Sequence, residues 1–165
     1  MLTMYDSVDV GALPAGALAV AGYVDGHWPT FPAVERAFPH AHRLSIATRS
    51  SSTADCLDVE NHDASIGQAP AWIRARPAGG RRPVIYVSLW QAQSLIDHLG
   101  ASGIPRGAYR IWTAHYTGRA HLCSPGCGLG FHDHAGATQY TNRAFGRNLD
   151  ASLVGGVAWF GRHGP

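Results

Sequence analysis

Eight short apolar segments recur along the 165 residues, and helix-like stretches separate several of them. The expected strands cover residues 4–8, 18–24, 42–48, 56–60, 83–89, 108–116, 137–141 and 150–154. Strands that alternate with helices favour parallel βα units. Because eight strands are enough to close a barrel, we expect an α/β fold, a small irregular TIM-like barrel that forms a single domain over residues 1–165. An open, doubly wound sheet is the competing architecture.

Three stretches are expected to be helices, over residues 30–38, 69–76 and 90–102. Pro70 stands in the first turn of the second stretch, where a proline is tolerated. In the third, Leu95, Ile96 and Leu99 lie at helical spacing on one face. No comparable stretch follows the sixth or seventh strand. The chain is also shorter than the roughly 200 residues at the lower end for such barrels, so the helices should be abbreviated.

Composition and charge exclude several classes of function. The net charge is only +2, and the arginines are scattered apart from a group at residues 74–82. A nucleic-acid-binding surface needs a clustered basic face, so no nucleic-acid partner is expected. The first ten residues lack the basic region of a signal peptide. The apolar stretch over residues 11–24 is interrupted by Pro14 and is too short to span a bilayer. If the protein acts outside a cell, another route must deliver it.

The most informative acidic residues are Asp58 and Glu60, which flank a single valine at the end of the expected fourth strand. Residues two apart in a strand face the same side, so the two carboxylates should point together while Val59 points into the other layer. Barrel active sites are built at this end of the strands. Asp6 lies toward the end of the first strand and Asp150 opens the last. In a closed barrel these two strands are neighbours, which would bring all four acids to one rim.

Four carboxylates in one cleft repel one another, which raises at least one pKa and retains a proton near neutral pH. A protonated glutamate beside an ionised aspartate is what cleavage of a glycosidic bond needs. One group protonates the leaving oxygen, and the other stabilises positive charge. The alternative is that each acid is a strand-end cap or a surface charge. The spacing of the Asp58–Glu60 pair on a buried-looking strand favours a function.

Several short motifs occur in a definite order: an Asp on the first strand, then "LDVE", "IYVS", "WTAHYTG", "ATQYT" and "LDAS". Together they resemble the glycoside hydrolase family 25 muramidases, and more closely the related glycoside-hydrolase-like proteins of actinobacteria and their phages. The resemblance extends from Asp6 to Val154. It implies an irregular barrel of the (β/α)5β3 type. It also implies cleavage of the bond between N-acetylmuramic acid and N-acetylglucosamine in peptidoglycan, with retention through the substrate's acetamido group.

The resemblance also implies roles for individual residues. Glu60 would be the general acid, and Asp58 would orient the acetamido group or stabilise the intermediate that it forms. Asp6 and Asp150 match the remaining acidic positions. The residues expected to line the cleft are Tyr86, Trp112, His115, Tyr116, Gln139 and Tyr140. Aromatic rings there would offer flat apolar faces to sugars, although ordinary packing is the alternative for each. No cofactor is required, and the partners would be peptidoglycan strands, with phage or cell-wall proteins as further candidates.

Two departures from the muramidase pattern favour a second hypothesis. The stretch before "DVE" is shorter than in true muramidases, and the first strand reads "YDSVD" rather than the usual Asp-x-Ser pattern. A shortened barrel would have fewer subsites for a long glycan. Because a fold does not by itself imply an activity, the alternative is a non-catalytic glycan-binding or structural protein, such as a component of a phage particle.

A second unusual stretch, "HLCSPGCGLGFHDHAG", covers residues 121–136. A structural Cys2His2 zinc site there would use Cys123, Cys127, His132 and His134, with His121 as a spare ligand. The alternatives are a glycine-rich loop with free thiols and solvated histidines, and a Cys123–Cys127 disulfide. A catalytic metal with Asp133 as its base is a further possibility.

Overall fold

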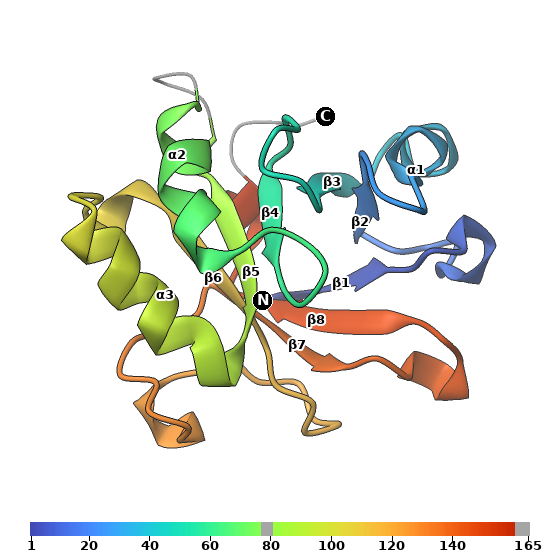
Figure 1. Cartoon of the computed structure of the whole chain (residues 1–165). Helices are drawn as coiled ribbons and strands as arrows, with labels where there is room; N and C mark the ends of the chain where they lie inside the picture. Colours follow the sequence, from blue (N-terminus) through green and yellow to red (C-terminus); the bar gives the residue numbers. More distant parts are fainter. Residues whose placement is uncertain (77–80, 161–165) are drawn as a thin grey trace.

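The computed structural model describes residues 1–76 and 81–160, in which eight strands form a closed barrel (Figure 1). The strands are β1 (Leu2–Asp6), β2 (Ala19–Tyr23), β3 (His42–Ala47), β4 (Cys56–Val59), β5 (Val84–Ser88), β6 (Arg110–Ala114), β7 (Ala137–Thr141) and β8 (Asp150–Val154). Each strand pairs with the next in the sequence, and β8 returns to pair with β1. The expected closed barrel is therefore confirmed, and the open doubly wound sheet is wrong.

The last strand runs against its neighbours. Strands β1 to β7 pair in parallel, whereas β8 is antiparallel to both β7 and β1. The expectation of parallel units is therefore wrong at β8. A parallel crossover needs a dozen or more residues, but the segment between Thr141 and Asp150 is shorter and holds only a short 3-10 turn, η5 (Ala144–Gly146). Consequently Asp150, the first residue of β8, lies at the same rim as the last residues of the parallel strands.

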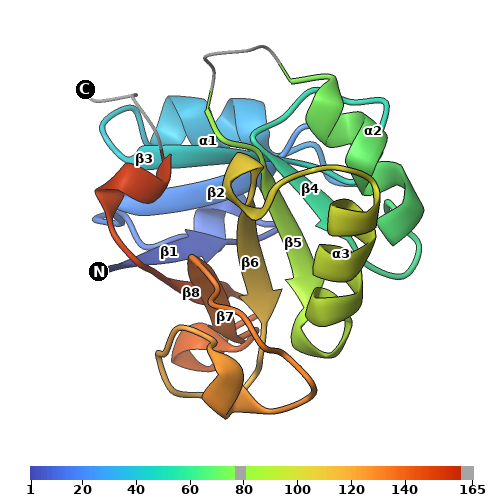
Figure 2. The same ribbon diagram turned by 90° about the vertical axis from the view of Figure 1, so that its left-hand side faces the viewer.

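Three α-helices occur in the described ranges: α1 (Phe31–Ala37), α2 (Ala69–Arg74) and α3 (Leu89–Ala101). They follow β2, β4 and β5. Figure 2 shows α2 and α3 on the side of the barrel formed by β4, β5 and β6. As expected, no α-helix of the described part follows β6 or β7. Short 3-10 turns lie in several connections, namely η1 (Val10–Ala12), η2 (Ile66–Gln68), η3 (Arg106–Ala108) and η4 (Pro125–Cys127), and a further one, η6 (Val157–Phe160), follows β8. Within residues 1–76 and 81–160, no helix combines the length and the apolar character needed to cross a bilayer.

The short helix α1 depends on proline and glycine. Pro32 stands in its first turn, and the helix ends two residues before Pro39, because a proline disfavours helical backbone in the residue that precedes it. Val34 is its buried residue and packs on β2 at Gly22. A Cβ atom at Gly22 would stand 2.9 Å from Val34 Cγ2 and 3.1 Å from the Phe31 Cα. The absence of a side chain at Gly22 thus lets the helix lie directly on the strand.

The barrel interior is apolar at one end and polar at the other. Residues that alternate along each strand separate into an inner cluster, which includes Met4, Cys56 and Trp112, and an outer cluster beneath α2 and α3. Trp159 and Phe160 of η6 belong to the inner cluster and close the end at which the parallel strands begin. The inward-facing polar residues lie at the opposite end. This leaves a polar mouth where the parallel strands end, which is where a site can form.

Candidate functional site

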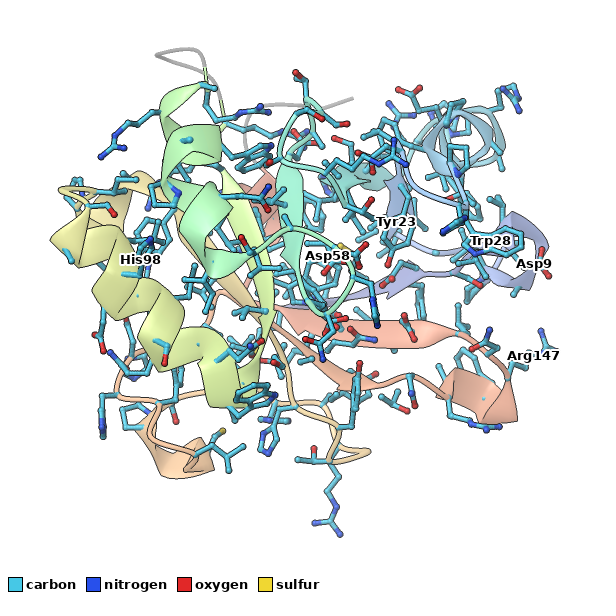
Figure 3. All side chains as sticks on the ribbon, in the orientation of Figure 1. Asp9, Tyr23, Trp28, Asp58, His98 and Arg147 are labelled. Atoms are coloured by element: carbon cyan, nitrogen blue, oxygen red, sulfur yellow. The ribbon has the colours of Figure 1, made fainter. Side chains whose placement is uncertain are left out.

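The four predicted carboxylates converge at the mouth of the barrel. Asp6, Asp58, Glu60 and Asp150 all line one cavity of about 260 Å³. Asp6 and Asp150 stand directly opposite each other across the β1–β8 pair. Asp58 faces inward from β4, as does Cys56, while Val59 belongs to the outer cluster. Figure 3 shows Asp58 near the centre of the molecule. The predicted convergence of the acids, and the predicted orientation of Val59, are confirmed.

Two of these carboxylates are buried and incompletely bonded. Asp6 is 2% exposed and Asp58 is 4% exposed. One oxygen of each, Oδ1, is buried and has no hydrogen-bond partner among the described residues. Buried polar atoms are nearly always hydrogen-bonded, because leaving them unpaired costs free energy. The two oxygens are therefore available to a ligand that brings its own donors into the mouth.

The pKa values of the acids at the mouth are raised. Burial raises the pKa of Asp58 well above its usual range, and the charge of Glu60 adds to the effect. Burial, and then Asp150, raise the pKa of Asp6 well above its usual range. Burial also raises the pKa of Asp150 to about 6, against the opposing effect of its hydrogen bonds with Asp6 and Gln139. The pKa of Glu60 is raised by burial and by the charges of Asp63 and Asp150. The mouth therefore retains protons at a pH where ordinary carboxyls have lost theirs.

These shifts predict that the protein becomes less stable as the pH rises from about 4 to 6. Unfolded carboxyls titrate near pH 4, whereas Asp150 in the folded protein titrates at about 6. In that window the folded state holds more protons, so the free energy of unfolding falls with rising pH, by on the order of 2 kcal/mol for this group. Asp150→Asn should flatten the dependence of Tm on pH between 4 and 7. The exposed Asp97→Asn should leave it unchanged, and equal profiles for both variants would contradict the prediction.

Aromatic and amide groups form the wall beside the acids. Tyr86, Trp112, Tyr116 and Gln139 line the cavity, as predicted. The Tyr86 hydroxyl donates to Gln139 Oε1 over 2.5 Å and lies 3.5 Å from the Tyr116 hydroxyl. Trp112 Nε1 donates to Ser152 Oγ over 3.0 Å, and its ring meets the Tyr86 ring edge-on at 4.7 Å. Trp112 is thus a fixed, buried floor, while Tyr116 is 54% exposed and presents a ring to the solvent.

Two residues that were expected in the cleft lie elsewhere. Tyr140 follows the inward-facing Gln139, so the alternation of β7 turns it outward, where it packs against the cluster that contains Leu149. His115 lies just past the end of β6, and its Nδ1 is 3.0 Å from His121 Nε2. Neither residue lines the cavity at the mouth.

The structure adds residues to the mouth that the sequence reasoning missed. Tyr23, Asn142 and Asn148 line the same cavity as the acids. Tyr23 is the last residue of β2, and the two asparagines lie in the β7–β8 connection. The place of Tyr23 at the mouth was predictable, because the final residue of a parallel strand lies at the active-site rim. The asparagines depend on the reversed direction of β8, which no local pattern indicates.

The mouth continues into a groove across the loops that follow β2, β3 and β4. A hollow of about 280 Å³ shares Tyr23, Asp58 and Glu60 with the mouth and extends to Trp28. A third hollow, of about 340 Å³, shares Asp63 with the second and continues past it. Trp28 is 62% exposed, and Figure 3 shows it on the β2 side of the molecule. We call these three linked hollows the groove. The sequence signal for it is the "DGHWP" turn after the second strand.

A larger cavity, of about 530 Å³, lies at the other rim of the barrel. It adjoins the beginning of β3, and its lining includes Asp55 and Arg81. Asp55 already bonds Arg81 over 3.1 Å and the Ser45 hydroxyl over 2.8 Å. The other acid in its lining, Glu35, is exposed to solvent, so among the described residues this cavity lacks the buried, unpaired carboxylate oxygens that distinguish the mouth. Chemistry based on carboxylates therefore belongs to the smaller cavity.

The histidine and cysteine side chains gather in a different set from the one expected. One potential ligand atom from each of His115, His121, Cys123 and Cys127 lies within 4.8 Å of the others. We call these four residues the His/Cys cluster, and it could bind a metal ion. All three cysteines are free, so the expected alternative of a Cys123–Cys127 disulfide is not formed. Burial raises the pKa of the Cys123 thiol to about 11, which argues against a nucleophilic cysteine because the reactive form is the thiolate.

His132 and His134 lie outside the His/Cys cluster, so the predicted ligand set is wrong in these two positions. Phe131 is buried in the core beneath α3, and the backbone N–H of His132 donates to Gln93 Oε1 on that helix. This packing carries the following residues away from the cysteines. Asp133 forms an ion pair with Arg106. Partial burial tends to raise the pKa of Asp133, but the bonds from Arg106 and from the His134 N–H outweigh it and lower the pKa. A carboxylate with a lowered pKa is unsuited to be a base.

Comparisons with known proteins show the fold and no more. No family model matches this sequence, and no curated protein sequence matches it either. The 1.07 Å crystal structure of an uncharacterized B. stearothermophilus protein is similar, with a TM-score of 0.59. The similarity covers 93% of this chain and 96% of that chain, at 12% sequence identity. This level of likeness supports a shared barrel architecture, and the chemistry must be argued from the site itself.

Proposed function

We propose that this protein is a peptidoglycan-directed glycoside hydrolase. It would cleave β-1,4 bonds between N-acetylmuramic acid and N-acetylglucosamine by carboxylate acid catalysis with retention. The observation that carries the proposal is the meeting of Asp58 and Glu60 in a polar mouth, where the pKa values of both are raised. The order of motifs along the chain adds support, and the barrel is then an abbreviated form of the (β/α)5β3 type.

The two acids differ in a way that suits them to different roles. Glu60 is half-buried and follows the end of β4, where it can reach a glycosidic oxygen and donate a proton to it. Asp58 lies deeper, with an unpaired Oδ1 that can accept a hydrogen bond from the substrate's acetamido N–H. Such a bond favours the ionised form of Asp58. The proton is then retained on Glu60, as acid catalysis requires.

The bonds that form and break in the proposed hydrolysis follow from this division of roles between Glu60 and Asp58. The acetamido oxygen attacks the anomeric carbon as the bond to the leaving oxygen breaks, and Glu60 protonates that oxygen. Asp58 stabilises the positively charged cyclic intermediate. Glu60, now ionised, takes a proton from water as the water opens the ring. Two displacements at one carbon retain its configuration. The reaction requires no metal, so any zinc held by the His/Cys cluster would be structural.

The groove favours a polymer over a small ligand. Its three hollows overlap end to end through shared residues, which would place successive sugars along one path. Tyr116 borders the mouth and Trp28 borders the second hollow, both as exposed rings. Flat aromatic faces stack on the apolar faces of sugars. A peptidoglycan strand is therefore the proposed partner, and the protein would act at the cell wall once delivered there, for example in phage lysis.

Trp28→Ala should weaken glycan binding. Loss of one stacking contact worth about 0.5–1.5 kcal/mol corresponds to an increase of about 2- to 12-fold in KM. The kcat should change little, because Trp28 lines the second hollow and not the mouth in which all four acids meet. Steady-state kinetics on soluble peptidoglycan fragments would measure both constants. Trp90, which is equally exposed but outside the three hollows, is the matched control. Equal effects of Trp28→Ala and Trp90→Ala would rule out the stacking role.

Digestion of purified peptidoglycan with the full chain tests the proposed reaction. We expect new reducing ends, and borohydride reduction should convert N-acetylmuramic acid, rather than N-acetylglucosamine, to its alditol. If no new reducing ends form, but the protein is folded and still sediments with peptidoglycan, the glycan-binding or structural alternative holds instead of the hydrolase. Absence of both release and binding would overturn the choice of peptidoglycan.

A further inference from the structure

The His/Cys cluster has the dimensions of a tetrahedral metal site. His115 Nδ1 and His121 Nε2 are 3.0 Å apart, and the sulfur of Cys123 lies 3.6 Å from each of these nitrogens. Cys127 supplies the fourth donor within 4.8 Å of the others. Zinc bonds of about 2.1 Å to nitrogen and 2.3 Å to sulfur place tetrahedral ligands about 3.4 Å (N–N) and 3.6 Å (N–S) apart. The two N–S distances match those separations, and the N–N distance is about 0.4 Å shorter.

The surroundings of His121 orient its ring toward the centre of the cluster. Its Nδ1 lies 2.8 Å from the carbonyl oxygen of Arg119. A carbonyl can only accept, so Nδ1 carries the proton and donates to it, and Nε2 keeps its lone pair on the side of the cysteines. Metal-binding histidines are commonly fixed in this way, with the other ring nitrogen bonded to a backbone carbonyl. The ring of His121 is thus in the tautomer that a metal ligand needs.

We propose that His115, His121, Cys123 and Cys127 hold a zinc ion in a closed, structural site. Two imidazoles and two cysteine sulfurs form a donor set that zinc takes in structural sites. Four protein ligands leave no open position for a substrate, which separates this site from the reaction at the mouth. The inference does not depend on the proposed hydrolase activity.

The zinc ion would anchor the long connection between β6 and β7, which lacks an α-helix. Figure 2 shows this gold and orange segment at the end of the barrel to which β6 points. The ligands would join the residue after β6 to the segment around Cys123, whose N–H donates to Thr138 Oγ1 and whose carbonyl accepts from Ala135. Farther along, the loop is held by the buried Phe131 and by the Asp133–Arg106 ion pair. The His115 N–H donates to the Gln139 carbonyl. Because Tyr116 follows His115 directly, the ion would also steady the Tyr116 side of the mouth.

Metal analysis of the purified full chain, produced with zinc in the medium, tests the site. We expect one zinc ion per chain in the wild type, and cobalt substitution should give the visible bands of tetrahedral Co²⁺ with a thiolate charge-transfer band. Cys127→Ser should weaken binding by more than the roughly 10- to 100-fold typical of outer-shell changes. The double variant His132→Ala/His134→Ala, in the same loop but outside the cluster, should keep the metal.

Two results would overturn the inference. One is a wild-type chain that takes up neither zinc nor cobalt after reduction of its thiols. The other is loss of the metal from the His132→Ala/His134→Ala variant together with its retention by Cys127→Ser. If Cys127→Ser does not fold, thiol reactivity of the wild type decides instead. Bound zinc should protect Cys127 from a thiol reagent, and EDTA should expose it, whereas equal reactivity with and without EDTA would count against the site.

Discussion

Glu60→Gln should reduce the release of peptidoglycan fragments by about 10²- to 10⁴-fold, the usual contribution of a general acid. Glutamine keeps the size and polarity of the side chain but has no proton to give to the leaving oxygen. Glycan binding should therefore stay nearly unchanged, because the aromatic walls and the Asp58 carboxylate remain in place. Reducing-end assays on purified peptidoglycan would measure turnover, and co-sedimentation would measure binding.

The chain offers a matched control for this experiment. Glu35 is the only other glutamate, and it is exposed on α1, outside the mouth. Glu35→Gln should retain full turnover. A Glu60→Gln variant that keeps wild-type turnover would remove Glu60 from the mechanism, and equal losses in both variants would indicate damage to the fold instead. Comparison of their Tm values separates these outcomes.

Removal of the metal should lower the Tm by about 8–16 °C. A ligand present at about 1,000 times its Kd stabilises the folded state by about 4.1 kcal/mol, and each kcal/mol corresponds to roughly 2–4 °C in a domain of this size. The physical reason is that the proposed ion would link four residues of the β6–β7 connection, which contains no α-helix and only the short 3-10 turn η4 among its described residues. Thermal unfolding with excess zinc and with EDTA would measure the shift.

The Cys127→Ser variant is the control for this shift. It should unfold at the lower temperature whether zinc or EDTA is present, because it lacks one of the four ligands. A wild-type chain with the same Tm in zinc and in EDTA would contradict a structural ion. An equal response of wild type and Cys127→Ser would show that the metal acts elsewhere on the protein.

Local patterns predicted most of the secondary structure. The seventh and eighth strands match the expected residues 137–141 and 150–154, and α3 lies within one residue of its expected limits. These elements are well marked because a strand or an amphipathic helix repeats its pattern over a few neighbouring residues. The fourth strand ends at Val59 and the sixth at Ala114, so Glu60 and His115 lie in loops just beyond, where boundaries depend on tertiary hydrogen bonds.

The pairing of Asp58 with Glu60 was readable from spacing alone, because a strand places alternate side chains on one face. The pairing of Asp6 with Asp150 required closure of the barrel, and it also required β8 to run backwards. A β8 parallel to its neighbours would have placed Asp150, its first residue, at the other rim. The His/Cys cluster shows the same limit, since its inclusion of His115 rather than His134 depends on where Phe131 packs.

The sequence by itself therefore determined which segments become strands and helices, which side chains share a strand face, and that several carboxylates lie at strand ends. These follow from interactions between residues close in the chain. Only the tertiary structure decided the direction of β8, the outward turn of Tyr140, the groove that reaches Trp28, and the replacement of His132 and His134 by His115 and His121. Each of these depends on contacts between residues distant in the sequence, whose free energies no local pattern records.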